Sequence, residues 1–483
     1  MSGSDTGAGD AADPSEHSKT LWHGRFEGAP AAELMEFTES LSFDRRLWRD
    51  DIEGSRAHVR GLVRSQLISA LEGDSILVAL DEVSDEMESD RFVFVASDED
   101  IHTAVERRVT EIAGDAGAKL HTGRSRNDQS ATDVRLWLKR EMRITARRVV
   151  MLQRVLLDRA VEAGDAYLPG YTHMQRAQPV LLAHHLLAHG WALGRDLDRL
   201  RDTIVRVDVS PLGAGALAGS SLPLDPAFTA RELGFSDVFE NSLDAVGSRD
   251  HIAEALFDLT MLAIDLSRLG EEWVLWTTEE FGFARLDDGY ATGSSMLPQK
   301  KNPDIAELAR GKAGRVIGDL AGLLATMKGL PLSYNRDYQE DKEPLFDAVD
   351  QVRRGLGAIS GMIATATFDL DRMRSAADSE SGSATDLAEW LVVRGVPFRE
   401  AHALVGALVR EALDYGSSLR DLVSGDDRLG PDAAQLVAPG VSVRRRITAG
   451  GAGPVPVAAQ LDRFRAALQR WSAWAEDDGA FDS

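Results

Sequence analysis

Three polar segments of the chain combine residue types that can bind a carboxylate and move a proton. The first, HTGRSRNDQ at residues 121–129, places two guanidinium groups beside hydroxyls and amides, and a guanidinium fork matches a carboxylate. The second, GYTHMQRAQP at residues 170–179, contains His173, a side chain that can act as acid or base near neutral pH. The third, GSSMLPQKKNPD at residues 293–304, places two lysines beside two serines. Such positive charge can lower a hydroxyl pKa or hold a developing carboxylate dianion.

Each segment also has a structural interpretation that the residues alone leave open. The first can be a polar loop that caps the following helix through Asn127 or Asp128. His173 can be a structural histidine. In the third segment, Asn302 precedes Pro303 and therefore suits a helix N-cap with proline at the first helical position. Capping and catalysis can coexist on one residue.

The elements that must position these segments are long helices. From Asp250 to Glu280 apolar residues such as Ile252, Leu256 and Leu259 recur every three or four positions, which is typical of an amphipathic helix. The same spacing covers four further stretches, residues 142–163, 186–207, 304–328 and 345–364. Five long helices in one chain predict a helix bundle rather than a βαβ fold. Apolar stripes of this length also predict an oligomer.

Composition and charge exclude several classes of function. The 483 residues include 78 Asp+Glu against 54 Lys+Arg, a net charge of −24, and no Cys. This charge opposes binding to nucleic acid or to an anionic membrane surface, and the lack of cysteine excludes disulfides, thiolate metal sites and cysteine nucleophiles. No apolar run approaches the ~18 residues of a membrane span, and residues 1–18 lack the apolar core of a secretory signal. We therefore expect a soluble cytoplasmic protein.

The basic residues add a second expectation. Only eight are lysines and the others are arginines. A dense acidic surface with few lysines is typical of a protein that works in molar salt, where the Debye length is ~3 Å and self-repulsion is weak. We predict a halophilic source; the alternative is an ordinary acidic cytosolic protein.

The three segments, in this order, resemble the signature regions of the fumarase/aspartase superfamily of lyases, and more narrowly the argininosuccinate lyase family. Further matches are WHGRF at 22–26, EDIHTAVERR at 99–108 and SYNRDYQEDK at 333–342. The resemblance runs from about residue 21 to the C-terminus and is weakest after about residue 370. It implies a mainly α fold, in which a central bundle of long helices tetramerises and two smaller, mostly helical domains flank it.

We divide the chain accordingly into four regions. Residues 1–20 are expected to be a disordered acidic tail, 21–121 an N-terminal helical domain, 122–375 the central helical bundle and 376–483 a C-terminal helical domain.

The resemblance implies a reversible elimination of argininosuccinate to arginine and fumarate without a cofactor. By this resemblance Ser294 is the base. Lys300 and Asn302 stabilise the carbanion as an aci-carboxylate dianion. His173 is the acid or proton relay, and Glu307 pairs with it and raises the imidazole pKa.

Further family positions are implied to bind substrate. They are Ser40, Asp100, His102, Arg126, Asn127, Thr172, Tyr334, Gln339 and Lys342. Among them Arg126 is implied to grip a carboxylate, whereas Asp100 and His102 match positions near the site without an assigned role. The family is a homotetramer whose active sites are shared between subunits, so we expect the same of this chain.

Two weaker signals point elsewhere. His185 and His189 are four residues apart on a predicted helix, but no glutamate completes an HExxH pattern. We interpret them as surface or interface histidines and predict no metal. Gly213, Gly215 and Ala218 match a loose dinucleotide fingerprint without the surrounding βαβ pattern, which favours a turn beside the site.

Two other functions stay open. The first is a sibling lyase that acts on another succinyl or aspartyl compound; residues 334–342 disfavour it because they match the arginine-side pocket of the family. The second is a structural protein with a silent site, since the family includes a lens crystallin. Retention of His173, Ser294, Lys300 and Glu307 disfavours this second alternative.

Overall fold

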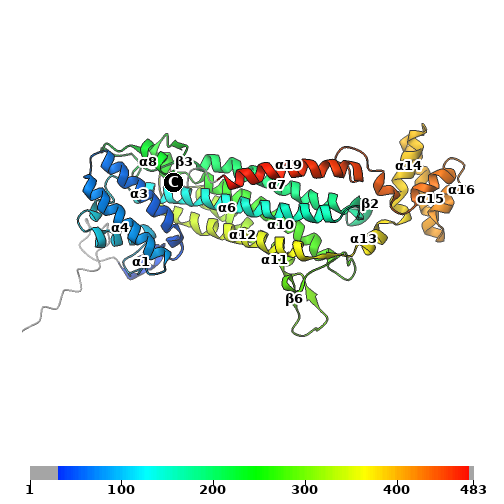
Figure 1. Ribbon diagram of the computed structural model, residues 1–483, viewed down its shortest axis with the longest axis horizontal. Helices are drawn as coiled ribbons and strands as arrows, with labels where there is room; N and C mark the ends of the chain where they lie inside the picture. Colours follow the sequence, from blue (N-terminus) through cyan, green and yellow to red (C-terminus); the bar gives the residue numbers. More distant parts are fainter. Residues whose placement is uncertain (1–30, 478–483) are drawn as a thin grey trace, which may run out of the picture. The chain divides into compact units, whose positions relative to one another are not determined.

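The computed structural model describes residues 31–477, which are mainly α-helical (Figure 1). The predicted acidic tail and the WHGRF match lie outside these residues. The chain folds as two compact units. Unit 1 comprises Met1–Lys139, Val207–Arg249 and Thr326–Glu343; unit 2 comprises Arg140–Arg206, Asp250–Ala325 and Pro344–Ser483. The division predicted from the sequence, at residues 121 and 375, stays a prediction.

Unit 1 is built from short and medium helices. They are α1 (Ala32–Thr38), α2 (Leu41–Asp44), α3 (Trp48–Arg64), α4 (Ala70–Glu88), α5 (Ile101–Ala113), α8 (Pro226–Glu232) and α9 (Ser242–Gly247), with a parallel pair β3 (Val209–Ser210) and β4 (Asp237–Val238). Helix α4 begins with a capping box, in which the Ser69 hydroxyl and the Glu72 carboxylate each accept a backbone N–H of the other residue. Helices α3, α4 and α5 pack against one another.

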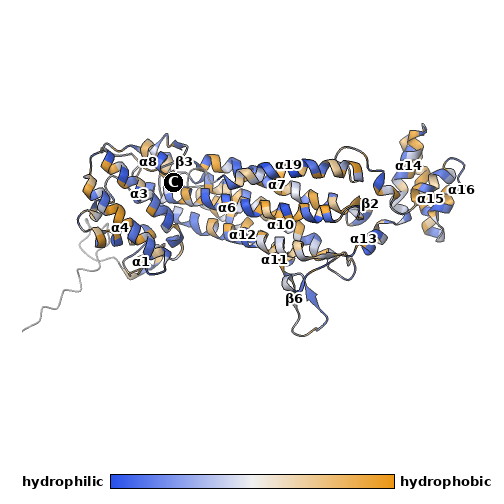
Figure 2. Ribbon diagram, in the orientation of Figure 1, coloured by the Kyte–Doolittle hydropathy of each residue, from blue (hydrophilic) through white to orange (hydrophobic). Residues whose placement is uncertain are grey.

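Unit 2 contains the long helices, and all five predicted from apolar spacing are confirmed. They are α6 (Arg126–Glu162), which begins in unit 1, α7 (Leu182–Val207), α10 (Asp250–Trp276), α11 (Asp304–Met327) and α12 (Lys342–Thr365). Leucines at the predicted spacing of α10, such as Leu256 and Leu259, are fully buried. Figure 2 shows apolar and polar residues alternating along these helices, as amphipathic packing requires.

A sixth long helix, α19 (Pro454–Glu476), belongs to the same bundle (Figure 1). Its Phe464 ring packs edge-to-face on Trp191 of α7 at 5.1 Å between centroids. The Arg143 guanidinium of α6 donates to the Trp474 carbonyl at 2.6 Å. Within residues 31–477 no helix has the length and apolarity needed to cross a membrane.

Three short antiparallel pairs and a helical cluster complete unit 2. The pairs are β1 (Tyr167–Thr172) with β2 (Gln175–Leu181), β5 (Ala284–Arg285) with β8 (Thr367–Phe368), and β6 (Thr292–Gly293) with β7 (Lys301–Asn302). The cluster is formed by α14 (Ala384–Val393), α15 (Phe398–Tyr415), α16 (Leu419–Gly425), α17 (Gly430–Ala434) and α18 (Val441–Arg444), whereas α13 (Leu370–Ala377) packs on β1. Leu387, Ala401 and Val423 are buried in its core.

Candidate active site

In unit 1, Ser40 is buried just before α2 and is held from two sides. Its hydroxyl donates to Asp44 Oδ2 at 2.6 Å, and Gln339 Nε2 donates to Ser40 Oγ at 3.3 Å. Asp44 in turn accepts the backbone N–H of Ile101 at 3.0 Å through its other oxygen. These bonds join two predicted substrate-binding residues, Ser40 and Gln339, that are 299 positions apart in the sequence.

Lys342 extends this group from the first residue of α12. Its side chain is 2% exposed, and Nζ donates to Gln339 Oε1 at 3.0 Å and to Asp341 Oδ1 at 3.1 Å. Asp341 also pairs with Arg249, so the buried carboxylate faces two cations. Burial disfavours its charge, but Lys342 and Arg249 outweigh burial and hold the pKa of Asp341 below its usual range. An ammonium has three donors, and two are used here.

Asp100 and Arg126 also come together in unit 1. Asp100 caps α5, because its Oδ1 accepts the backbone N–H of Thr103 at 2.6 Å. Arg126, at the start of α6, lies 3.7 Å from Asp100 Oδ2 and 3.2 Å from Glu106 Oε2. The Arg126 guanidinium therefore has two carboxylate neighbours within the chain. A substrate carboxylate would add a third anion or displace one of them.

His102 is a buried cation held between two aspartates. Its Nδ1 lies 2.9 Å from Asp51 Oδ1 and 3.1 Å from Asp133 Oδ2. Burial opposes the imidazolium, but the hydrogen bonds and charges of Asp133 and Asp51 outweigh burial and raise the pKa of His102 to about 10. Such a histidine stays protonated at neutral pH, so it suits a fixed charge rather than a proton donor.

Asn127 and Asp128 occupy the first turn of α6, so the interpretation of either as its N-cap is wrong. Helix α6 begins at Arg126, and the preceding Ser125 N–H donates to Asp128 Oδ1 at 2.9 Å. Asp128 Oδ2 accepts the N–H groups of Gly213 at 3.0 Å and Gly215 at 2.8 Å. Asn127 Nδ2 donates at 3.0 Å to the carbonyl of Ala216, which follows Gly215.

The turn 211–219 therefore wraps the start of α6. Gly213 and Gly215 have φ of 105° and 62°, which only glycine adopts freely. The expected turn is confirmed by these contacts with Asp128.

Tyr334 lies in the segment that precedes the 3-10 helix Arg336–Asp341 of unit 1. Its ring is half-buried, 6.3 Å from Tyr338 between centroids. Burial raises the pKa of Tyr334, so the phenol is neutral and can donate a hydrogen bond.

In unit 2, Thr172 and His173 lie at the tip of the hairpin β1–β2, where Thr172 pairs with Gln175. The two turn residues, His173 and Met174, both have positive φ, 54° and 59°. A two-residue turn of this kind favours Asn-Gly, and non-glycine residues there carry strain that is often linked to function. Thr172 and His173 are exposed.

Ser294 begins the loop 294–300, which the β6–β7 pair closes at its base. Its Oγ accepts the backbone N–H groups of Met296 at 3.2 Å and Leu297 at 2.9 Å. Hydrogen bonds donated to an oxygen favour its deprotonated form. The loop therefore already provides two donors for a serine alkoxide.

The two lysines of this loop differ in their partners. Lys301 Nζ donates to the Leu286 carbonyl at 2.5 Å and to Asp288 Oδ1 at 2.7 Å. Lys300 is exposed, and within residues 31–477 its Nζ has neither a hydrogen bond nor an ion pair. Lys300 is thus the lysine whose charge is available to a ligand.

Asn302 and Glu307 frame the start of α11. Asn302 lies on β7, and its Nδ2 donates to Thr292 Oγ1 at 3.4 Å. Glu307, in the first turn of α11, is exposed and its nearest cation is Arg310 at 3.9 Å. Within the described part of the chain, no hydrogen bond or ion pair joins Glu307 to His173, or either of them to Ser294 or Lys300.

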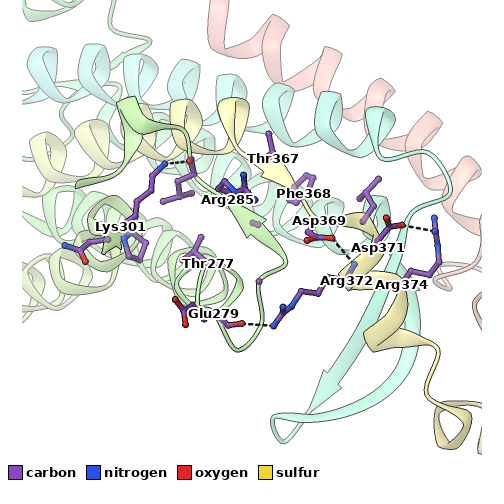
Figure 3. Close-up of a pocket in the computed structure, with 16 residues that line it drawn as sticks. Thr277, Glu279, Arg285, Lys301, Thr367, Phe368, Asp369, Asp371, Arg372 and Arg374 are labelled. Atoms are coloured by element: carbon purple, nitrogen blue, oxygen red, sulfur yellow. Dashed lines mark hydrogen bonds and ion pairs between the residues drawn. The ribbon is translucent and has the colours of Figure 1, made fainter. Parts of the chain in front are cut away.

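A cavity of about 910 Å³ in unit 2 holds only one of the predicted site residues, Asn302 (Figure 3). Three of its four cations are already engaged by the protein, and the exposed Arg285 is the fourth. Arg372 donates to the carbonyls of residues 279–281, and Arg374 pairs with Asp371 at 3.2 Å. Lys301 lies at the opposite wall with its own partners (Figure 3). Within the described residues the Arg285 guanidinium has neither a hydrogen bond nor an ion pair, so the cavity offers one cation to a ligand but contains a single predicted site residue.

Four aspartates that were not predicted support the predicted residues. Asp51 and Asp133 hold His102, Asp44 holds Ser40, and Asp341 holds Lys342. The sequence did contain a signal for Asp51. Asp51 lies midway between Leu47, in the turn before α3, and Ser55, in α3, at a spacing of four residues that places all three on one buried face. A charge on an apolar stripe indicates a buried partner.

Two family models and several curated proteins match the chain. The family model described as "Lyase" matches residues 24–318, and the one described as "Argininosuccinate lyase C-terminal" matches residues 382–442. The chain is 51% identical to an argininosuccinate lyase of Symbiobacterium thermophilum, over 91% of this chain and 97% of the relative. It is 50% identical to an argininosuccinate lyase of Cutibacterium acnes, over 94% of this chain and 99% of that relative.

Solved structures show the same architecture. The crystal structure of EDDS lyase in complex with formate superposes with a TM-score of 0.80 at 29% identity, covering 93% of this chain and 92% of that one. A fumarate lyase from Mesorhizobium superposes with a TM-score of 0.72, covering 89% of this chain and 97% of that one. At 19% identity this match shows a common fold alone. Fold and matches together define a helical lyase of the fumarase/aspartase superfamily. Within that superfamily, the chain belongs to the argininosuccinate lyase family.

Proposed function

We propose that the chain catalyses the reversible elimination of argininosuccinate to L-arginine and fumarate, in arginine biosynthesis in the cytoplasm and without a cofactor. Family membership supports this reaction. The structural observation that carries it is the Ser294 hydroxyl oxygen, which accepts two backbone N–H groups at the base of an exposed loop.

The elimination divides into two proton movements. Ser294 removes a proton from the carbon next to a carboxylate, and the carbanion is stabilised as an aci-carboxylate. The free Lys300 ammonium and the Asn302 amide supply charge and a donor where the dianion grows. The C–N bond then breaks, its electron pair goes to the departing guanidinium nitrogen, and His173 protonates that nitrogen.

Two conditions make these groups competent. Ser294 needs an environment without water, so the loop 294–300 closes over the substrate. His173 needs a carboxylate neighbour, because a nearby anion raises the imidazole pKa. Glu307 takes this role. Since the two residues do not meet within the chain, we assign their pairing to two subunits.

Substrate binding falls to the remaining predicted positions. Arg126 binds a carboxylate of the substrate. Lys342 has one ammonium donor left, and Ser40, Gln339 and Tyr334 offer hydroxyl and amide groups. The other three contacts of this set are Asp100, Asn127 and Thr172, with His102 as a fixed positive charge behind Asp100.

We further infer a homotetramer with active sites shared between subunits. Helix α11 exposes Leu308, Ile317 and Leu324. Its glycines at 311, 314, 318 and 322 have open space beside their Cα atoms. An apolar face with such small residues allows close approach of another helix, which supports self-association along α11.

The first experiment follows fumarate by its ultraviolet absorbance after argininosuccinate is added. Fumarate with equimolar arginine is expected, and Ser294→Ala is expected to lower kcat by about 10²–10⁴. Ser295→Ala, at the exposed next residue, is the matched control and should keep near-normal kcat. No fumarate from folded protein, but activity on another fumarate-yielding compound, would favour a sibling lyase. No activity on any such compound would favour a structural protein.

A mixing experiment tests the shared site. Ser294→Ala and His173→Asn homotetramers are dissociated, mixed and reassembled. Partial recovery of activity is expected, because some sites receive a native Ser294 from one subunit and a native His173 from another. Mixed tetramers verified by mass spectrometry that stay inactive would contradict sharing.

A further inference from the structure

Two histidines and a glutamate, none of them among the predicted site residues, meet on the surface of unit 2. His185 and His189 lie one turn apart on α7, and Glu272 comes from α10. His185 Nε2 is 2.6 Å and His189 Nε2 is 2.8 Å from the same oxygen, Glu272 Oε2. This group does not match the HExxH pattern, because its glutamate lies 83 residues after His189 and on another helix.

Their ligand atoms are placed as a divalent transition metal requires. One atom from each of the three residues lies within 4.8 Å of the others. Zinc binds imidazole nitrogen and carboxylate oxygen at about 2.0–2.2 Å in a tetrahedron, which sets neighbouring ligand atoms roughly 3.3 Å apart. The observed separations of 2.6 and 2.8 Å need to open by only about 0.6 Å.

Burial and packing also suit an ion with one open position. The side chains of His185, His189 and Glu272 are 22%, 15% and 37% exposed, so the group is accessible yet fixed. The Trp276 ring packs on His185 at 4.9 Å between centroids and limits its rotation. The neighbouring Glu271 is bound to Arg310 at 2.7 Å and does not compete.

The other group of this composition, Asp51, His102 and Asp133, lacks these properties. It is fully buried, and its imidazole is held protonated between the two carboxylates. A protonated imidazole nitrogen cannot ligate a metal, and two buried guanidinium groups, Arg124 and Arg126, act on Asp51. That group carries no metal proposal.

We propose that His185, His189 and Glu272 bind one divalent transition-metal ion, zinc above all, with water as fourth ligand. Two imidazoles and a carboxylate are a ligand set that zinc takes when one position stays open. His185 is four residues beyond Leu181, the last residue of β2. The ion therefore ties the root of the hairpin β1–β2 to α10.

The test uses the full chain, stripped with a chelator and titrated calorimetrically with ZnCl2. One zinc per chain is expected in the wild type. His189→Gln, His185→Gln and Glu272→Gln are each expected to raise Kd at least about tenfold, as loss of a ligand or its support does. His402→Gln, at an exposed histidine of α15, is the matched control and should leave Kd unchanged.

A second measurement does not depend on the variants. Co²⁺ added to the stripped wild type is expected to give the intense visible bands of a four-coordinate site, which His189→Gln abolishes. Zinc is also expected to raise the Tm of the wild type, because it binds the folded state only. Absence of stoichiometric zinc binding, or equal binding by His189→Gln and wild type, would overturn the proposal and leave a simple His–Glu hydrogen-bond cluster.

Discussion

The predicted site residues of the two units differ in how they are held. In unit 1, Ser40 and Lys342 are almost fully buried, and both are hydrogen-bonded to Gln339, which is 299 positions from Ser40 in the sequence. In unit 2, His173 and Lys300 are exposed on a hairpin and a loop. Buried charges require partners, since an unpaired buried ion is costly, whereas exposed ones do not. The proposed binding residues of unit 1 are therefore held in place by the folded chain, whereas the proposed reacting residues His173 and Lys300 of unit 2 are not.

The largest expected effect distinguishes His102 from His173. His102→Gln leaves Asp51 and Asp133 buried without the cation that contacts both, so a loss of about 3–5 kcal/mol in unfolding free energy is expected. His173→Gln, on the exposed hairpin tip, is expected to change it by no more than about 0.5 kcal/mol while lowering kcat by about 10²–10⁴. Urea midpoints and fumarate release measure the two effects. Equal destabilisation by both variants would contradict the comparison.

A pH series sharpens the same comparison. The pKa of His102 is about 10 in the folded chain, against 6.5 for an ordinary histidine. The folded state therefore binds this proton more tightly, and the stability it contributes is complete below pH 6.5 and is lost as pH rises through 10. The urea midpoint of the wild type is expected to fall across this window. Asp133, whose pKa is raised to about 8 by burial and by Asp51, titrates in the same window. The two chains are therefore compared above pH 8, where His102→Gln should show a shallower fall and parallel curves would contradict this assignment.

The next effect compares two adjacent lysines. Lys300→Met removes the lysine without a protein partner and is expected to lower kcat by about 10²–10³, as for loss of a donor to a developing anion. Lys301→Met removes an ion pair with Asp288 on the loop's base and should lower kcat less than tenfold. Steady-state kinetics measure both, and KM separates weaker binding from slower chemistry. A larger loss from Lys301→Met would reverse the assignment.

How much of the fold the sequence predicts depends on how regular the apolar stripe is. Helix α10 was predicted to within four residues at its C-terminal end, because its leucines recur without interruption. Helix α6 begins sixteen residues before the predicted start at 142, since its first turns bury polar residues such as Asp128, Thr132 and Asp133. Spacing identifies a buried face only where that face is apolar.

The sequence did not indicate which side chains support the motif residues. The fold brings Ser40, Gln339 and Lys342 together, and likewise Asp100 and Arg126. Neither Asp133 beside His102 nor Glu272 beside His185 could be predicted, because each partner comes from another helix. Periodicity shows which face of a helix is buried but not which helix packs on it.

The smallest expected effect is a change of Tm with salt. Salt screens exposed charges, whereas it has little effect on the buried clusters. With a net charge of −24, the chain repels itself in dilute buffer, and molar KCl shortens the Debye length to about 3 Å. If the chain is adapted to high salt, its Tm rises between dilute buffer and molar KCl by at least about 2–4 °C, which corresponds to roughly 1 kcal/mol in large domains. His102→Gln should show the same rise, because the ion pairs of the buried cluster are little screened. Differential scanning calorimetry measures both, and equal Tm values in dilute buffer and molar KCl would contradict halophilic adaptation.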